Sequence, residues 1–211
     1  MLTRKSDDQL KAILLFPNLV SLSVLLGQPV MNFNLIARAA KLRDLVASRQ
    51  QRFVLAESCT GGWLAASLSA LPGISQWWCG SLVVYRGGSK QQWLEISGAV
   101  LDDPDIGPVS ERVTTELALQ ALAHTSEADI SIAVTGDLGP GVSPEKDGRV
   151  YCALAERGTT DILKAHTRLI CPAPQDVTDI VARIARLEEA SLWVFDQAIE
   201  WLQTTATGRR R

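Results

Sequence analysis

The chain has 211 residues, a formal net charge of −2 and an apolar fraction of 46%. This length suits one well-buried domain and is short for two. The charge argues against the broad basic surface that nucleic-acid binding requires. Four cysteines lie far apart without a CxxC pair, which predicts neither a zinc site nor a disulfide framework and is typical of a reducing compartment. We therefore expect a cytoplasmic globular protein with no nucleic-acid or membrane partner.

The beginning of the chain does not fit the pattern of the remainder. Charged residues precede a largely apolar run over 13–30, which a proline and a glycine interrupt. A signal peptide is one interpretation, but two aspartates lie in the charged region and no A-x-A cleavage site follows. The run is also short and broken for a membrane span. We interpret residues 1–33 as an extension outside the fold, with Met31 as the natural start.

From Asn34 onward, the spacing of apolar residues predicts helices that alternate with strands, which is typical of an α/β fold with helices on both faces of a mixed sheet. The folded domain is expected to span 34–203, followed by a flexible basic tail over 204–211. A turn is expected at Gly87-Gly88 and a long loop over 136–148. Strands are expected over 52–57, 76–85, 129–135, 149–156 and 161–170, and helices over 34–46, 61–71, 90–96, 110–123 and 176–202.

A short run of small and polar residues, Glu57-Ser58-Cys59-Thr60-Gly61-Gly62, joins the first expected strand to the helix over 61–71. Ser58 is thereby placed at a strand end beside a helix N-terminus, where unpaired backbone N–H groups favour an anion or a developing oxyanion. Ser58 could be a nucleophile with donors already in place. Alternatively, Ser58 or Thr60 caps the helix, and these residues alone favour this commoner role.

A nucleophilic serine needs a base, and the chain has only two histidines. His124 is expected at a helix C-terminus and His166 in mid-strand, so neither is well placed for a triad. Lys90 is the other candidate, because a lysine whose pKa is lowered can accept a proton. Ser58, Tyr85 and Lys90 could meet where the carboxyl ends of parallel strands lie together. A solvated lysine remains the alternative, and spacing alone favours it.

The glycine-rich loop that follows Thr135 is long for a compact domain, which is typical of functional loops. Its backbone N–H groups could cradle a phosphate, with Lys146 as a point charge. Asp137 would oppose an anionic ligand, and the loop is not a Walker A motif.

Taken together, these segments resemble the CinA C-terminal domain family, whose characterised members are nicotinamide-nucleotide amidohydrolases (NMN deamidases). The resemblance covers roughly residues 34 to 203. The motifs that carry it are Ala56-Glu57-Ser58-Cys59-Thr60-Gly61-Gly62, Leu71-Pro72-Gly73, Tyr85 with Lys90, Val109-Ser110-Glu111, Val134-Thr135-Gly136, Gly139-Pro140-Gly141 and Ser143-Pro144-Glu145-Lys146.

The resemblance implies a three-layer α/β/α sandwich, with a mixed and mostly parallel sheet of about five strands. It implies hydrolysis of nicotinamide mononucleotide to nicotinate mononucleotide and ammonia, without metal or cofactor. Ser58 would attack the amide carbon, while Lys90 and Tyr85 would activate it and relay the proton. Backbone N–H groups near Ser58 and Thr135 would hold the oxyanion. The implied substrate-binding residues are Thr60, Gly61, Gly62, Thr135, Gly136, Gly139, Gly141, Ser143 and Lys146.

Three departures from the family pattern leave a second hypothesis open. Arg86-Gly87-Gly88-Ser89 stands where the family usually reads Ser-Asn-Glu-Ala, and Asp137-Leu138 replaces small apolar residues. Pro174-Gln175-Asp176-Val177 stands where a Gly-Asp-Arg element is usual. Such changes also fit an inactive or re-purposed paralogue that binds a small ligand or a partner protein. Apolar positions on the last helix would suit a homodimer or the core equally.

Overall fold

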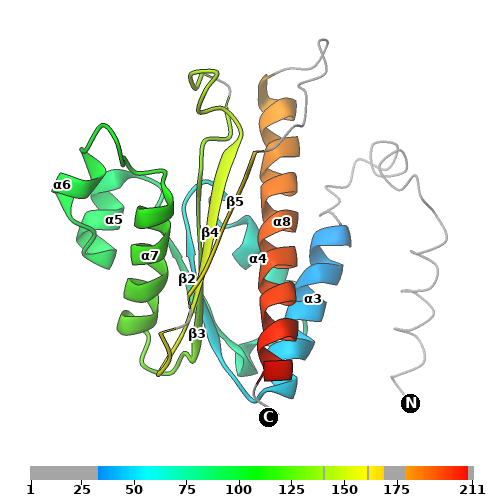
Figure 1. Cartoon of the computed structure of the whole chain (residues 1–211). Helices are drawn as coiled ribbons and strands as arrows, with labels where there is room; N and C mark the ends of the chain where they lie inside the picture. The colour runs from blue at the N-terminus through cyan, green and yellow to red at the C-terminus, as the bar shows by residue number, and fades with distance from the viewer. Residues whose placement is uncertain (1–32, 140, 161, 169–178, 209–211) are drawn as a thin grey trace, which may run out of the picture. The chain divides into compact units, whose positions relative to one another are not determined.

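The computed structural model describes residues 33–139, 141–160, 162–168 and 179–208. The predictions for the N-terminal extension up to residue 32, for the changed segment Pro174–Val177 and for Arg209–Arg211 lie outside these residues. Figure 1 shows the described elements around one sheet. In chain order they are α3 (Phe33–Ser48), β1 (Phe53–Glu57), α4 (Trp63–Ser69), the 3₁₀ turn η1 (Ile74–Gln76), β2 (Trp78–Val83), α5 (Gly87–Leu94), α6 (Gly98–Leu101), α7 (Glu111–His124), β3 (Ile130–Gly136), β4 (Arg149–Glu156), β5 (Ile162–Arg168) and α8 (Asp179–Gly208).

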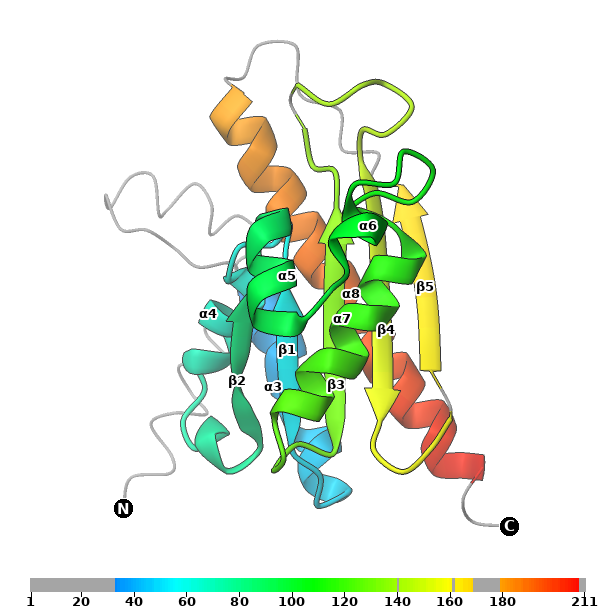
Figure 2. The same ribbon diagram turned by 90° about the vertical axis from the view of Figure 1, so that its left-hand side faces the viewer.

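The sheet has five strands in the order β2-β1-β3-β4-β5, which can be followed in Figure 2. β1 pairs in parallel with both β2 and β3, whereas β4 is antiparallel to both β3 and β5. The α/β class and the mixed sheet are therefore confirmed, but the expectation of a mostly parallel sheet is wrong. A loop and a hairpin join β3, β4 and β5, and parallel pairing there would need crossover connections.

Helices cover both faces of the sheet, with α5, α6 and α7 on one side and α3, α4 and α8 on the other (Figures 1 and 2). The described residues form two hydrophobic cores, one on each face of the sheet, and successive residues of β1 pack alternately into them. Phe53 and Leu55 pack with α3, α4 and α8, whereas Val54 and Ala56 pack with α5, α6 and α7. β1 is consequently buried along its whole length, as expected for a strand whose two faces are both covered.

The carboxyl end of β1 is the place where the connections diverge. The chain leaves β1 through α4 to reach β2 on one side, and later returns as β3 on the other side. In open α/β sheets, such a switch point is where ligands bind, outside the carboxyl ends of the strands. Ser58 follows β1 directly and therefore lies at this point.

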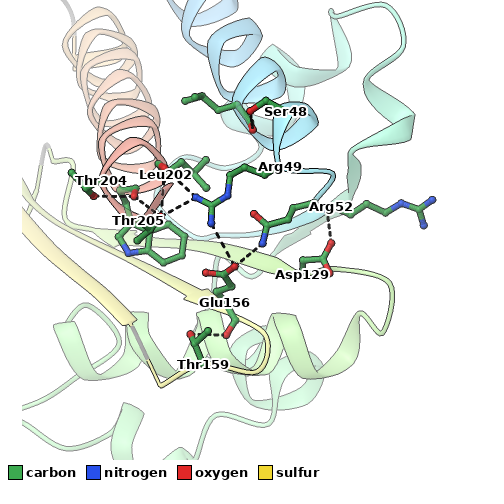
Figure 3. Close-up of polar contacts among 12 residues, drawn as sticks. Ser48, Arg49, Arg52, Asp129, Glu156, Thr159, Leu202, Thr204 and Thr205 are labelled. Carbon is green, nitrogen blue, oxygen red and sulfur yellow. Dashed lines mark hydrogen bonds and ion pairs between the residues drawn. The ribbon is translucent and has the colours of Figure 1, made fainter. Parts of the chain in front are cut away.

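Polar side chains tie the elements together at the opposite end of the sheet (Figure 3). Arg49 Nη1 donates to the carbonyl of Leu202 at 3.0 Å and to Thr205 Oγ1 at 2.8 Å. Gln51 Nε2 donates to the buried Glu156 Oε1 at 2.6 Å. These contacts join the segment after α3 to β4 and α8, and we assign them a structural role.

The last helix extends beyond its predicted end. It continues to Gly208, so residues 204–208 are helical rather than part of a flexible tail. Its apolar positions, which suited a homodimer or the core equally, also divide along its length: Ile180, Val181 and Ile184 in the first turns are exposed, and only the later part of the helix packs in the core. No helix among the described residues has the length and apolar character needed to cross a membrane.

Candidate functional site

Ser58 and Lys90 meet at the carboxyl end of β1. Lys90 Nζ donates to Ser58 Oγ at 2.8 Å and to the carbonyl of Val84 at 2.9 Å. Both side chains are buried, with exposed fractions of 5% for Ser58 and 1% for Lys90. The structure thus brings together the serine and the lysine that the sequence singled out, and the solvated-lysine alternative is wrong.

The environment of Lys90 favours its neutral form. Burial lowers the pKa of Lys90 from 10.5 to about 8, because desolvation disfavours the charged form. The hydrogen-bond partners of Nζ are a hydroxyl and a carbonyl, and neither stabilises the ammonium as a carboxylate would. A substantial fraction of Lys90 is therefore neutral in mildly alkaline solution, where the amine can accept a proton from a neighbouring hydroxyl.

The segment before Lys90 forms the start of α5 rather than the predicted turn at Gly87-Gly88, since the helix begins at Gly87. Ser89 Oγ accepts from the backbone N–H of Arg86 at 3.2 Å and donates to its carbonyl at 2.8 Å. The N–H of Lys90 also donates to that carbonyl, at 3.1 Å. The departure from the family pattern over 86–89 is therefore compatible with a helix that presents Lys90 to Ser58.

Glu57, which the sequence analysis did not assign to any role, organises the turn that carries Ser58. Its carboxylate is fully buried and accepts from the backbone N–H groups of Gly62 and Leu64, both at 3.1 Å, and of Ala65 at 2.9 Å. The predicted capping of α4 by Ser58 or Thr60 is therefore wrong, because Glu57 takes the helix N–H groups. Its position as the only charged residue of an otherwise apolar strand was the signal that could have identified it.

Two hydroxyl groups complete the shell around the Glu57 carboxylate. Thr60 Oγ1 donates to Oε2 at 2.8 Å, and Ser81 Oγ of β2 donates to Oε1 at 2.9 Å. One buried carboxylate thereby joins β1, α4 and β2 through five hydrogen bonds. The positive end of α4 is consequently occupied by the protein's own anion, not left open for a ligand.

The donors that remain near Ser58 come from the turn itself. The N–H of Ser58 donates to the carbonyl of Val134 at 3.1 Å, and that of Gly61 donates to the carbonyl of Ser58 at 3.1 Å. Within the described part of the chain, the N–H groups of Cys59 and Thr60 make no hydrogen bond to another residue. These two groups directly follow the candidate nucleophile, which is where an oxyanion hole is commonly built. Gly61 and Gly62, with φ of 58° and 100°, make this tight turn possible.

The side chain of Tyr85 makes no hydrogen bond to Ser58 or to Lys90. This side chain is 56% exposed, and its phenol oxygen accepts from Arg183 Nη2 of α8 at 3.0 Å. Arg183 Nη1 donates to the carbonyl of Gly139 at 2.8 Å. The sequence analysis missed Arg183, whose only signal was a cation between the apolar positions Ile180 and Ile184.

Several predicted binding residues make close contacts within the protein. Thr135 is buried, and its Oγ1 lies 2.7 Å from Thr114 Oγ1. A Cβ on Gly136 would lie 2.9 Å from Cys59 Sγ, so only glycine fits beside that thiol. A Cβ on Gly139 would lie 2.5 Å from Asp147 Oδ1. Close packing therefore requires glycine at position 136, whether or not a ligand binds there, whereas Gly139 and Gly141 have positive φ angles of 45° and 87°, which favour glycine.

The long loop carries ion pairs that were not expected. Asp137 Oδ2 accepts from Arg149 Nη2 at 2.8 Å, so the carboxylate predicted to oppose an anion already has a cationic partner. Asp147 is likewise paired with Arg186 of α8. The remaining predicted binding residues of the loop, Gly141, Ser143 and Lys146, are exposed.

Neither histidine contacts the serine. His124 ends α7, at the end of the sheet where β3 begins, and its Nε2 lies 3.8 Å from Glu95 Oε1. His166 lies in the edge strand β5, with its ring centroid 6.1 Å from that of Tyr151. Among the described residues, no group of three or more His, Cys, Asp or Glu side chains is arranged to hold a metal ion. The lysine is therefore the basic side chain that the fold places at Ser58.

Known proteins are similar to this chain in sequence and in fold. The profile of the family described as CinA C-terminal domain matches residues 36–176. A CinA-like protein of Pseudothermotoga lettingae is 30% identical over 155 residues, which cover 72% of this chain and 36% of that protein. A putative competence-damage inducible protein of Clostridium kluyveri is 34% identical over 160 residues, covering 74% and 38%. The chain therefore spans little more than a third of these two relatives. A crystal structure of a CinA superfamily protein from Klebsiella pneumoniae has a TM-score of 0.69 at 25% identity, covering 81% of this chain and 98% of that chain.

Proposed function

The chain belongs to the CinA C-terminal domain family, and on that basis we propose that it is an amidohydrolase that converts nicotinamide mononucleotide and water to nicotinate mononucleotide and ammonia. The observation that carries the proposal is the 2.8 Å hydrogen bond between Lys90 Nζ and Ser58 Oγ. A buried lysine with a lowered pKa beside a buried serine is typical of an activated nucleophile. The resemblance to characterised NMN deamidases supplies the substrate.

In the first half of the proposed reaction, neutral Lys90 accepts the hydroxyl proton of Ser58 while Oγ forms a bond to the carboxamide carbon. The carbonyl oxygen becomes an oxyanion, for which the N–H groups of Cys59 and Thr60 are the candidate donors. Lys90 then passes its proton to the amide nitrogen, the carbon–nitrogen bond breaks and ammonia leaves. The product of this half is a nicotinoyl ester on Ser58.

The second half regenerates the enzyme with one water molecule. Neutral Lys90 accepts a proton from water, and the resulting hydroxide attacks the ester carbon. The bond to Ser58 Oγ breaks, and Oγ takes the proton back from Lys90. Nicotinate mononucleotide leaves as the carboxylate, and its acid proton is taken up by the released ammonia. The net change consumes one amide and one water molecule.

The direct test measures ammonia release from nicotinamide mononucleotide by the purified protein and by Ser58→Ala. We expect turnover in the wild type and none above background in the variant, because the nucleophile is absent. Ser48→Ala removes an exposed hydroxyl at the end of α3 and serves as the matched control with unchanged turnover. A folded wild type without turnover would refute the substrate, and full activity in Ser58→Ala would refute the nucleophile.

The pKa of Lys90 predicts the pH dependence of the reaction. Below a pKa of about 8 the lysine is protonated and cannot accept the serine proton, so kcat/KM should fall about tenfold per pH unit. Above that value the amine is neutral, and kcat/KM should reach a plateau. A pH–rate profile of kcat/KM checks this. An inflection near the usual histidine pKa of about 6.5, or a flat profile, would argue against Lys90 as the base.

One observation favours the second hypothesis of a non-catalytic paralogue. The phenol of Tyr85 contacts Arg183 instead of the Ser58–Lys90 pair, although the resemblance implies that it takes part in catalysis. If the protein only binds its ligand, calorimetry should detect nicotinamide mononucleotide with the wild type and no ammonia should form. Turnover that depends on Ser58 would eliminate this hypothesis.

A further inference from the structure

Arg183 connects three segments that are far apart in the sequence. It comes from the first turns of α8 and donates from Nη2 to the phenol oxygen of Tyr85, which lies between β2 and α5. Its Nη1 donates to the carbonyl of Gly139 in the loop after β3. The loop and the turn before α5 both begin at the carboxyl ends of strands next to β1. The guanidinium is therefore held at the edge of the sheet where Ser58 lies.

The charge of Arg183 is unmatched, unlike that of its neighbours. Arg149 and Arg186, which also contact the loop, are paired with the carboxylates of Asp137 and Asp147. Among the described residues, Arg183 makes hydrogen bonds only to a neutral phenol and a neutral carbonyl, and it forms no salt bridge. A half-buried guanidinium with neutral partners gains further from an anion, because a carboxylate or phosphate adds Coulomb attraction and can accept two parallel N–H bonds.

The electric field of Arg183 reaches the candidate active site. Burial raises the pKa of the Cys59 thiol to about 12, and the Arg183 guanidinium opposes this rise more than any other charge does. Cys59 is the residue after Ser58, and its N–H is one of the candidate oxyanion donors. A ligand with its carboxamide at Ser58 would therefore place its remaining atoms within the influence of this cation.

We propose that Arg183 selects substrates that carry a phosphate monoester, by exchanging its contacts with Tyr85 and Gly139 for hydrogen bonds to the phosphate oxygens. This inference rests on the proposed function, because it names the residue that binds the phosphate, which is the part of the nucleotide that lies away from the carboxamide. The exchange also releases the phenol of Tyr85 from its present hydrogen bond. A phosphate-bearing substrate thus frees the one implied catalytic side chain that makes no hydrogen bond to Ser58 or Lys90.

The test compares nicotinamide mononucleotide with nicotinamide riboside, which has the same carboxamide and no phosphate. We expect the wild type to favour the mononucleotide in kcat/KM, and Arg183→Gln to reduce this preference by about 10- to 100-fold, chiefly through KM for the mononucleotide. Arg183→Lys should fall between the two, because it retains the charge without the paired donors. The control is Arg38→Gln, which removes an exposed ion pair between Arg38 of α3 and Asp196 of α8, the helix that carries Arg183. This variant should retain the full preference.

Binding separates a failure of this inference from a failure of the proposed reaction. Calorimetry with Ser58→Ala and with the double variant Ser58→Ala/Arg183→Gln compares the two ligands without turnover. Tighter binding of the mononucleotide that Arg183→Gln abolishes supports the role of Arg183 even if no ammonia is released. An unchanged preference in a folded Arg183→Gln protein, equal binding of the two ligands, or binding of neither would overturn it.

Discussion

Replacing Lys90 by methionine is expected to abolish turnover and to make the fold more stable. The loss of the base should lower kcat by at least about 10³-fold. The gain in stability arises because the charged side chain of Lys90 is unfavourable in the folded protein. Burial lowers its pKa from 10.5 to about 8, which corresponds to about 3 kcal/mol of unfavourable free energy. Methionine fills a similar volume without that charge. We expect a gain of about 1–3 kcal/mol at pH 7, since the hydrogen bonds to Ser58 and Val84 are lost.

The pH dependence of the free energy of unfolding tests whether the buried charge of Lys90 causes this gain in stability. The unfolded chain holds the Lys90 proton more tightly than the folded chain, so the free energy of unfolding of the wild type should rise between pH 8 and 10.5 through this group. Lys90→Met removes this contribution, and its advantage should shrink over the same interval. Urea unfolding of both proteins at several pH values measures the difference.

Lys41→Met is the matched control for this experiment, because Lys41 is an exposed lysine on α3. It should change the free energy of unfolding by less than about 0.5 kcal/mol and leave turnover unchanged. Retained turnover in Lys90→Met would exclude the lysine as the base. A less stable Lys90→Met protein would show that its two hydrogen bonds outweigh the cost of burying its charge.

The sequence was sufficient for the features that depend on local patterns. A buried apolar run followed by small residues and a helical stretch correctly predicted β1, the turn at Ser58 and α4. These inferences needed only periodicity. The geometry of parallel strands allowed Lys90 to lie near Ser58, as it does in the structure. Spacing alone, however, favoured a solvated lysine, because a local pattern does not show that the side chain is buried.

Features that depend on contacts between distant segments were not predictable. The partners of Arg183 are 98 and 44 residues away in the chain, and no local pattern specifies such contacts. The role of Glu57 was hidden for a different reason. A carboxylate that caps a helix from the preceding strand lies outside the usual N-cap position, so the capping rules pointed to Ser58 and Thr60 instead.

Glu57→Gln is the second substitution with a large expected effect, and it should lower both stability and turnover. Both carboxylate oxygens of Glu57 accept hydrogen bonds, including three from the backbone N–H groups at the start of α4. Glutamine replaces one oxygen by an NH₂ group, which cannot accept from an N–H donor. Even with the NH₂ group at the Oε1 position, the N–H of Ala65 loses its acceptor. We expect a loss of about 2–4 kcal/mol, and a displaced turn at Ser58.

Glu156→Gln is the control that separates the two effects. Glu156 is also buried, but it lies at the opposite end of the sheet, where its Oε1 accepts from Gln51 (Figure 3). Both variants should unfold at lower urea concentrations, whereas only Glu57→Gln should lose kcat when both are assayed under conditions in which they are folded. Because Glu57 acts on the reaction only by positioning Ser58, its loss should leave the pH profile centred near the pKa of Lys90. Equal losses of kcat in the two variants would mean that Glu57 contributes stability alone.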